Sequence, residues 1–275
     1  MHELDIRKAV EIALAEDIGQ GDLTAELIAS DKRATASVVS REEAILCGTD
    51  WFDETFYQID SGIDVNWQTA DGDSIVPDQT LCTLSGPARA LLTGERTALN
   101  FLQTLSGTAT LARTFADRVR DLPVKILDTR KTLPGMRNAQ KYAVRCGGCF
   151  NHRKGLYDAI LIKENHIIAC GSIADAIQQA RHFHPDIPVE VEVETVSEAD
   201  AALRAGADAL LLDNFTVDML QETVSMNRGR VKLEASGGIT LNNLREIAET
   251  GVDYISTGAL TKNVQAIDIS MRLVL

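Results

Sequence analysis

The second half of the chain alternates short β-rich runs with helical segments, and this alternation constrains the fold more than any other feature. The six runs are VKILDT from 124, AILIKE from 159, VEVEVE from 189, ALLLDN from 209, KLEAS from 232 and DYISTG from 253. Most gaps hold a helical segment of about ten to fifteen residues. Gly206 and Gly251 each close such a segment just before the next strand. Alternating strands and helices predict parallel strands with right-handed crossovers.

Charged or hydroxyl side chains recur where these predicted strands end. They are Asp128 with Arg130 and Lys131, Lys163 with Glu164, Glu192 with Glu194, Asp213, Ser236 and Thr257. Six strand–helix units can close into a barrel or stay open as a doubly wound sheet. A barrel gathers all strand ends at one mouth, so the pattern favours a barrel.

The first half has a different pattern. Residues 3–16 place apolar side chains at helical spacing and predict an amphipathic helix. GQGDLT lacks the third glycine of a dinucleotide-binding loop, so we interpret it as a turn with a helix cap at Asp22. Short runs between Ala34 and Gly86 predict a small sheet with hairpins. Pro87 opens a helix to about Leu105, and a second helix is predicted over 108–120.

Composition limits the possible partners and the compartment. The chain has 275 residues, 45% of them hydrophobic, which is enough for one large domain or two modest ones. Its net charge of -13 argues against nucleic acid or an anionic membrane as partner, because both would repel the surface. Without a membrane-length apolar run or a cleavage-type leader, we expect a cytoplasmic protein. Five cysteines, an odd number, fit reduced thiols.

One segment contradicts the acidic balance. The stretch from Arg130 to Lys163 has eight basic side chains and one acid, Asp158. The bases are Arg130, Lys131, Arg137, Lys141, Arg145, Arg153, Lys154 and Lys163. The rest of the chain has nineteen bases and thirty-nine acids. Such a concentration indicates a pocket for a small, multiply charged anion, and a solvated basic face is the alternative.

Three acids alternate with valines in VEVEVET. Glu190, Glu192 and Glu194 therefore lie on one face of the predicted strand, and the apolar face toward the helices turns them inward. Buried carboxylates need partners. The cationic segment, a divalent metal or substrate hydroxyls could supply them, and structural ion pairing is the alternative.

Glycine-bearing turns end the last two strands, in ASGGIT at 235–240 and STGALT at 256–261. Backbone N–H groups at such junctions bind phosphate, which in barrels commonly sits after the late strands. Cys146-Gly-Gly-Cys149 lacks the second pair that structural zinc requires. We interpret it as a tight turn that brings His152 and Arg153 toward the mouth.

Several long motifs resemble the quinolinate phosphoribosyltransferase family and cover nearly the whole chain in the expected order. They are EDIGQGDLT, GERTALNFLQTLSG, LDTRKTLPGMR, GGCFNHRKGLYDAILIKENH, EVEVET, LLLDNF, LEASGGI and STGALT. The resemblance implies an N-terminal α/β sandwich-like domain, residues 1–110, on which the tail 265–275 packs back. It also implies a C-terminal open or incomplete α/β (TIM-like) barrel, residues 111–264, and a homodimer with shared active sites. Assemblies larger than a dimer stay open.

The resemblance also implies roles for the site residues. Those expected to hold the two carboxylates of quinolinate are Arg130, His152, Arg153 and Lys163. Arg96 would reach in from the partner chain, although taken alone it is interpreted as a surface or salt-bridged arginine. Lys131 would lie near both substrates.

Phosphoribosyl pyrophosphate is the second substrate that the resemblance implies. Glu192 and Asp213 would serve its ribose hydroxyls and magnesium and, with Lys131, form the catalytic group. The residues expected to cradle phosphate are Ser236, Gly237 and Gly258. The chain departs from the family pattern at two positions. Lys262 stands where many relatives have histidine and is expected to bind substrate as the retained cation near pyrophosphate, and Cys149 interrupts a glycine run.

The implied reaction joins phosphoribosyl to the ring nitrogen of quinolinate with loss of CO2, giving nicotinate mononucleotide and pyrophosphate on the route to NAD. Quinolinate is a dianion, and guanidinium forks match carboxylates bidentately. Magnesium is the implied cofactor. No organic cofactor is needed, because the alkylated ring nitrogen accepts the electrons released when the neighbouring carboxylate leaves.

Three alternatives stay open. A paralogue with the same scaffold, such as the relative associated with molybdenum transport, would act on another base. An aldolase-type barrel would use Lys131 or Lys163 to form a Schiff base. A binding or scaffold protein would need a broken site, yet every expected position except 262 matches.

Overall fold

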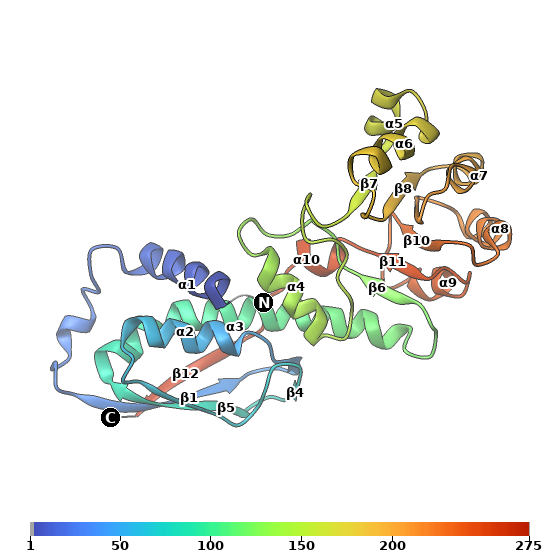
Figure 1. The fold of residues 1–275 in the computed structure, drawn as a ribbon. Coiled ribbons are helices and arrows are strands. Elements are labelled where there is room, and N and C mark those ends of the chain that lie inside the picture. The colour runs from blue at the N-terminus through green and yellow to red at the C-terminus, as the bar shows by residue number, and fades with distance from the viewer. Residues whose placement is uncertain (1–2, 275) are drawn as a thin grey trace. The chain divides into compact units, whose positions relative to one another are not determined.

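The computed structural model describes residues 3–274, which form two compact units. The first unit comprises the chain up to Arg113, the segment Leu133–Gly148 and the chain from Asn263. The second comprises Thr114–Thr132 and Cys149–Lys262. Figure 1 shows the helices and strands of each unit and labels most of them.

An antiparallel sheet forms one layer of the first unit. Its strands are β1 (Arg33–Ser40), β3 (Asp64–Trp67), β5 (Thr80–Pro87) and β12 (Ile269–Val274), in the order β12-β1-β5-β3. Two short strands, β2 (Ala44–Ile45) and β4 (Ser74–Ile75), pair separately. Burial alternates along β1, as expected for a strand with one face on the core.

Helices supply the rest of the core of this unit. They are α1 (Glu3–Ile18), the short 3-10 helix η1 (Ala25–Leu27), α2 (Thr49–Ile59), α3 (Ala88–Arg118) and α4 (Arg137–Cys146). One apolar cluster joins the sheet to α2 and α3, through Phe52, Phe56 and Leu99 among others. A second cluster joins α1, α3 and α4. The predicted helix over 3–16 is confirmed. The predicted turn at Asp22 is also present, because Asp22 Oδ1 accepts hydrogen bonds of 3.0 Å from the amides of Thr24 and Ala25, although the N-cap residue of η1 is Thr24.

Two predictions for the first half were wrong. The stretch between Ala34 and Gly86 contains the helix α2 as well as strands. The predicted helices before and after Gly107 are one continuous helix, α3. Gly107 is needed for a close approach rather than a break, because a Cβ there would lie 2.0 Å from the Gln265 carbonyl oxygen.

The division into units differs from the expected domain boundaries by two or three residues at 111–113 and 263–264, and by one whole internal segment. Residues 133–148 were assigned to the barrel, but they belong to the first unit. The reason is the apolar face of α4, where Ala139 and Ala143 are buried in the same cluster as Val10 of α1. At the other end of the chain, β12 pairs with β1.

The second unit has six parallel strands, at the six positions that the sequence predicts. They are β6 (Lys125–Leu127), β7 (Ile160–Ile162), β8 (Val189–Val193), β9 (Ala209–Asp213), β10 (Lys232–Ser236) and β11 (Tyr254–Ser256). Their order is β6-β11-β10-β9-β8-β7. Among residues 3–274 the sheet therefore ends at β6 and β7, as in an open or incomplete barrel.

Helices follow five of these strands within the second unit. They are α5 (Glu164–Cys170), α6 (Ile173–Phe183), α7 (Val196–Ala205), α8 (Val217–Asn227), α9 (Leu244–Ala248) and α10 (Ala259–Lys262). The side chains of Ser172, Thr195 and Thr216 accept hydrogen bonds at the starts of α6, α7 and α8. Gly206 ends α7 in the left-handed conformation, with φ +84°. None of the helices between residues 3 and 274 has the length and hydrophobicity needed to span a bilayer.

Candidate active site

The carboxyl ends of the parallel strands carry most of the predicted site residues. These residues are Arg130 and Lys131 after β6, Lys163 after β7, Glu192 in β8, Asp213 at the end of β9, Ser236 at the end of β10 and Gly258 after β11. Parallel strands place these ends at one edge of the sheet. Phe150 bridges to Leu127 of β6, and this brings the segment with His152 and Arg153 to the same edge.

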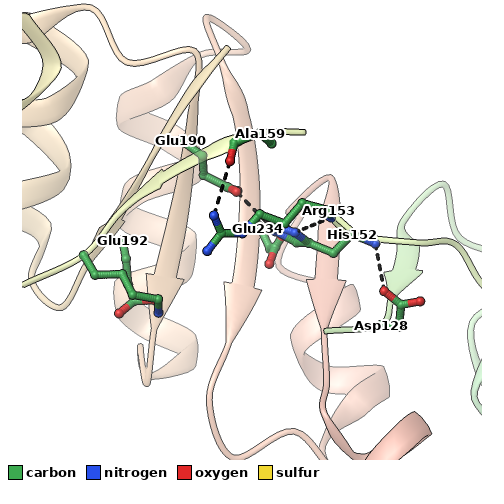
Figure 2. A network of polar contacts seen from close by, with 8 residues as sticks. Asp128, His152, Arg153, Ala159, Glu190, Glu192 and Glu234 are labelled. Atoms are coloured by element: carbon green, nitrogen blue, oxygen red, sulfur yellow. Dashed lines mark hydrogen bonds and ion pairs between the residues drawn. The ribbon is translucent and has the colours of Figure 1, made fainter. Parts of the chain in front are cut away.

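His152 lies between two carboxylates of the sheet, as Figure 2 shows. Its Nε2 is 3.2 Å from Glu190 Oε2 and 3.4 Å from Glu234 Oε2. Burial alone lowers the pKa of His152, but hydrogen bonds and charges from Glu190 and Glu234 outweigh it and raise the pKa to about 10. The Arg153 amide donates a hydrogen bond of 2.7 Å to Nδ1. Because an accepting nitrogen carries no proton, this contact disfavours protonation of the ring at Nδ1. Both ring nitrogens are thus engaged within the protein.

These three side chains also have the donor types of a cation site. One ligand atom from each of His152, Glu190 and Glu234 lies within 4.8 Å of the others. The imidazole itself is the partner of both carboxylates in this arrangement. The trio is therefore described most simply as a buried polar network that fixes the ring.

Asp128 holds the segment that carries His152. It follows β6 and is fully buried. Its Oδ1 accepts a hydrogen bond of 3.0 Å from the His152 amide, and its Oδ2 accepts one of 2.6 Å from Asn151 Nδ2. Asp128 therefore positions the backbone at the edge of the sheet.

Two guanidinium groups lie close enough to interact. Burial lowers the pKa of Arg153, and the positive charge of Arg130 lowers it further, while Glu190 and nearby acids oppose both effects. The Arg153 Nη1 donates to the Ala159 carbonyl oxygen over 3.2 Å, which fixes one side of its fork (Figure 2). Two partly buried arginines together favour an anion with at least two negative groups.

Carboxylates lie on the neighbouring strands β8 and β9. Glu192 forms an ion pair with Lys163, whose side chain is 45% exposed. Asp213 is partly buried, and its Oδ2 accepts a hydrogen bond from Asn214 Nδ2 over 2.9 Å. Magnesium is commonly held by one or two carboxylates together with substrate phosphates, so this pair of acids on adjacent strands suits it.

Glycines shape the two late strand ends. A Cβ at Gly237, which has φ +87°, would lie 2.2 Å from Asn214 Oδ1. A Cβ at Gly258 would lie 2.9 Å from Lys131 Cδ, so the Lys131 side chain passes directly over this glycine. Lys131 is also fixed through its carbonyl, which accepts a hydrogen bond from the Thr261 hydroxyl over 2.8 Å.

Two other predicted site residues, Arg96 and Lys262, have no contact described above. Arg96 is an exposed residue of α3 in the first unit, so the arrangement of the second unit does not include it. Lys262 is the exposed last residue of α10. Their expected roles remain predictions.

Sequence reasoning missed Glu234. The sequence shows it only as one acid in the apolar strand KLEAS, between Leu233 and Ala235. In the structure it is 2% exposed and lies beside His152. An isolated acid in a strand that is otherwise apolar was the available signal, because burying it requires a partner.

Comparisons with known proteins point to one family over nearly the whole chain. Two family profiles match, quinolinate phosphoribosyl transferase N-terminal domain over residues 22–106 and C-terminal domain over residues 108–272. A probable nicotinate-nucleotide pyrophosphorylase (carboxylating) of Bacillus subtilis is 43% identical, covering 100% of this chain and 96% of that protein. The nicotinate-nucleotide pyrophosphorylase (carboxylating) of Mycobacterium leprae is also 43% identical, covering 97% and 96%. The solved nicotinate-nucleotide pyrophosphorylase structure from Francisella tularensis has a TM-score of 0.97 at 47% identity, covering 100% and 98%.

Proposed function

Because the chain belongs to the quinolinate phosphoribosyltransferase family, we propose that it transfers phosphoribosyl from phosphoribosyl pyrophosphate to the ring nitrogen of quinolinate with decarboxylation. The products are nicotinate mononucleotide, pyrophosphate and CO2, and the reaction is a step of NAD biosynthesis. The chain is then a pentosyltransferase that needs no organic cofactor.

The placement of Arg130 and Arg153 at the same edge of the sheet is the observation that carries this proposal. Arg130 follows β6, and the bridge of Phe150 to Leu127 brings Arg153 to that edge, so two guanidinium forks match the two carboxylates of quinolinate. Each charge-assisted hydrogen bond to a carboxylate contributes roughly 1.5–3 kcal/mol. His152 has both ring nitrogens engaged, so we assign it a supporting role that fixes the backbone of Arg153.

The ion pair of Lys163 with Glu192 suggests how the site accepts both substrates. Each side chain neutralises the other before substrate binds. Quinolinate would attract Lys163, and the ribose hydroxyls would attract Glu192, so binding separates the pair. Before substrate binds, neither charge is therefore buried without a partner.

Glu192 and Asp213 are the residues that would hold magnesium, together with the substrate. When bound, the ion offsets negative charge on departing pyrophosphate. The residues of this chain mainly position the reactants, because holding the ring nitrogen in line with the anomeric carbon removes much of the entropic barrier. The loops at Gly237 and Gly258 supply room and backbone N–H groups for phosphate.

One assay tests the proposed reaction. Release of CO2 from carboxyl-labelled quinolinate is measured with and without phosphoribosyl pyrophosphate and magnesium, and we expect release only when both are present. Turnover of nicotinate in place of quinolinate would instead support the paralogue. Trapping by borohydride would support Schiff-base chemistry at a lysine.

Arg130→Lys tests the carboxylate fork directly. Lysine keeps the positive charge but loses bidentate geometry, so we expect kcat/KM for quinolinate to fall about 10- to 150-fold, equivalent to 1.5–3 kcal/mol. Arg145→Lys, at an exposed position of α4 in the same basic segment, is the matched control and should be unaffected. Unchanged turnover in Arg130→Lys would remove this residue from the site.

We further propose a homodimer in which Arg96 completes the site of the partner chain, and a cytoplasmic location. The exposure of Arg96 leaves it available for such a contact.

A further inference from the structure

A second cluster of ligand-type side chains lies in the first unit. Cys47, Asp71 and Cys146 each offer one ligand atom, and these atoms lie within 4.8 Å of one another. The three residues are far apart in the sequence: Cys47 follows β2, Asp71 precedes β4 and Cys146 ends α4. All three belong to the first unit, whereas the proposed active-site residues other than Arg96 belong to the second.

The carboxylate of this cluster is held in place. At the start of α2, Asp71 Oδ1 accepts hydrogen bonds of 3.0 and 3.2 Å from the amides of Gly48 and Thr49. Its Oδ2 accepts one of 2.9 Å from the Tyr142 hydroxyl. The Tyr142 ring in turn packs on Trp51, with 5.7 Å between centroids. Outer partners of this kind orient metal-binding carboxylates.

The two sulfur atoms are reduced thiols that interact with each other. Cys47 is fully buried and Cys146 is partly exposed, so an ion can reach the pair from the side of Cys146. The two thiols lie close enough to hydrogen-bond to each other, so two soft ligand atoms stand side by side next to the Asp71 carboxylate.

Two further carboxylates lie near Asp71. Burial and the nearby charge of Asp71 both raise the pKa of Asp50. Burial also raises the pKa of Asp53, while the hydrogen bond that Trp67 donates to it lowers this pKa. Carboxylates next to two thiols suit a cation that also binds sulfur.

We propose that Cys47, Cys146 and Asp71 bind a thiophilic divalent cation of the Zn²⁺ class. Zn–S bonds of about 2.3 Å and Zn–O bonds of about 2.1 Å in a tetrahedron place the ligand atoms roughly 3.6–3.8 Å apart, within the separation found here. A water molecule completes the four ligands. The ion displaces the thiol protons to solvent and links α4 to the chain after β2.

The test uses the full-length protein after treatment with reductant and chelator, and it is independent of catalysis. Zn²⁺ is titrated in competition with a chromogenic chelator, and Co²⁺ is added separately to detect the thiolate-to-cobalt charge-transfer band. We expect one ion per chain, release of one to two protons and higher heat stability with Zn²⁺.

Matched variants locate the site. Cys47→Ala and Cys146→Ala should each lower Zn²⁺ affinity at least about 100-fold and abolish the Co²⁺ band. Cys82→Ala, a buried thiol of the same unit, and Cys170→Ala, an exposed thiol, should leave both unchanged. Circular dichroism checks that each variant folds. Asp71→Asn keeps an acceptor for the α2 amides, so it should retain the band while weakening affinity.

Two results would overturn the proposal. The first is no stoichiometric Zn²⁺ uptake by the reduced wild-type protein. The second is uptake that survives in both folded variants, Cys47→Ala and Cys146→Ala.

Discussion

At the scale of single residues, Gly237 shows how closely the late strand ends of the second unit are packed. Its φ of +87° disfavours any side chain, and a Cβ would also meet the side chain and the amide nitrogen of Asn214. Conformation and space thus both require glycine beside Asp213. The loop that is proposed to hold phosphate is fixed by its own packing.

We expect Gly237→Ala to destabilise the protein by more than the conformational cost alone. Gly229→Ala is the matched control, because Gly229 has φ +73° but nothing within 4 Å of a new Cβ. The control should lose about 1–2 kcal/mol from its φ alone, and Gly237→Ala should lose more. Urea unfolding of both variants measures the difference. Equal losses would show that Asn214 moves aside freely.

Asp22 gives a prediction with a pH dependence. Its pKa is lowered mainly by the Ala25 amide, with help from the Thr93 hydroxyl. A lowered pKa in the folded state means that this stability is present above the unfolded pKa of 3.8 and is lost as pH falls through the folded value. Asp22→Ala should therefore lower the free energy of unfolding by about 1 kcal/mol at neutral pH. The difference from wild type should vanish at strongly acidic pH, and a difference independent of pH would contradict this cause.

At the scale of elements, α3 depends on a glycine that would normally weaken a helix. Glycine is about 1 kcal/mol less favourable than alanine inside a helix, so Gly107→Ala should ordinarily stabilise. Here the new methyl group would meet the carbonyl of Gln265, which leads into β12. We expect a lower melting temperature and faster amide exchange in β12. A higher melting temperature would show that the terminal segment tolerates displacement.

The elements also show what the sequence could predict. The strands of the second unit were predicted correctly because buried parallel strands are short apolar runs between helices that end in glycine. The helix α2 was missed because its core residues Trp51, Phe52 and Phe56 are aromatic and equally suited to strands. Gly107 was taken as a helix end because the contact that requires it comes from a segment more than 150 residues later.

Some residues of the candidate site could likewise be predicted from the sequence, and others could not. Cationic residues at strand ends could be found from their positions alone, because the strand pattern brings those ends together. The contacts of Glu234 and Asp128 could not be predicted in this way. Their partners lie in the segment from Phe150 to Arg153, and the path of that segment is not evident from the sequence. The grouping of Cys47 with Cys146 likewise depends on how α4 packs in the first unit.

At the scale of the whole molecule, the proposed dimer makes a quantitative prediction. Arg96→Ala and Lys163→Ala should each be inactive. If each site takes Arg96 from one chain and Lys163 from the other, a mixed dimer contains one intact site of two. Random mixing of equal amounts should then restore about a quarter of wild-type activity. Activity is measured after the chains have exchanged, and no recovery would indicate a site made by one chain.

The pairing of β1 with β12 has a consequence for the newly made protein. While the ribosome is still producing the middle of the chain, the outer edge of β1 has no complement, because Ile269–Val274 do not yet exist. Every segment of the parallel α/β unit, by contrast, has been synthesised once Lys262 emerges. The strands of the later region are thus all available before the earlier sheet is complete, and the edge of β1 stays open to other pairing partners until β12 has been made.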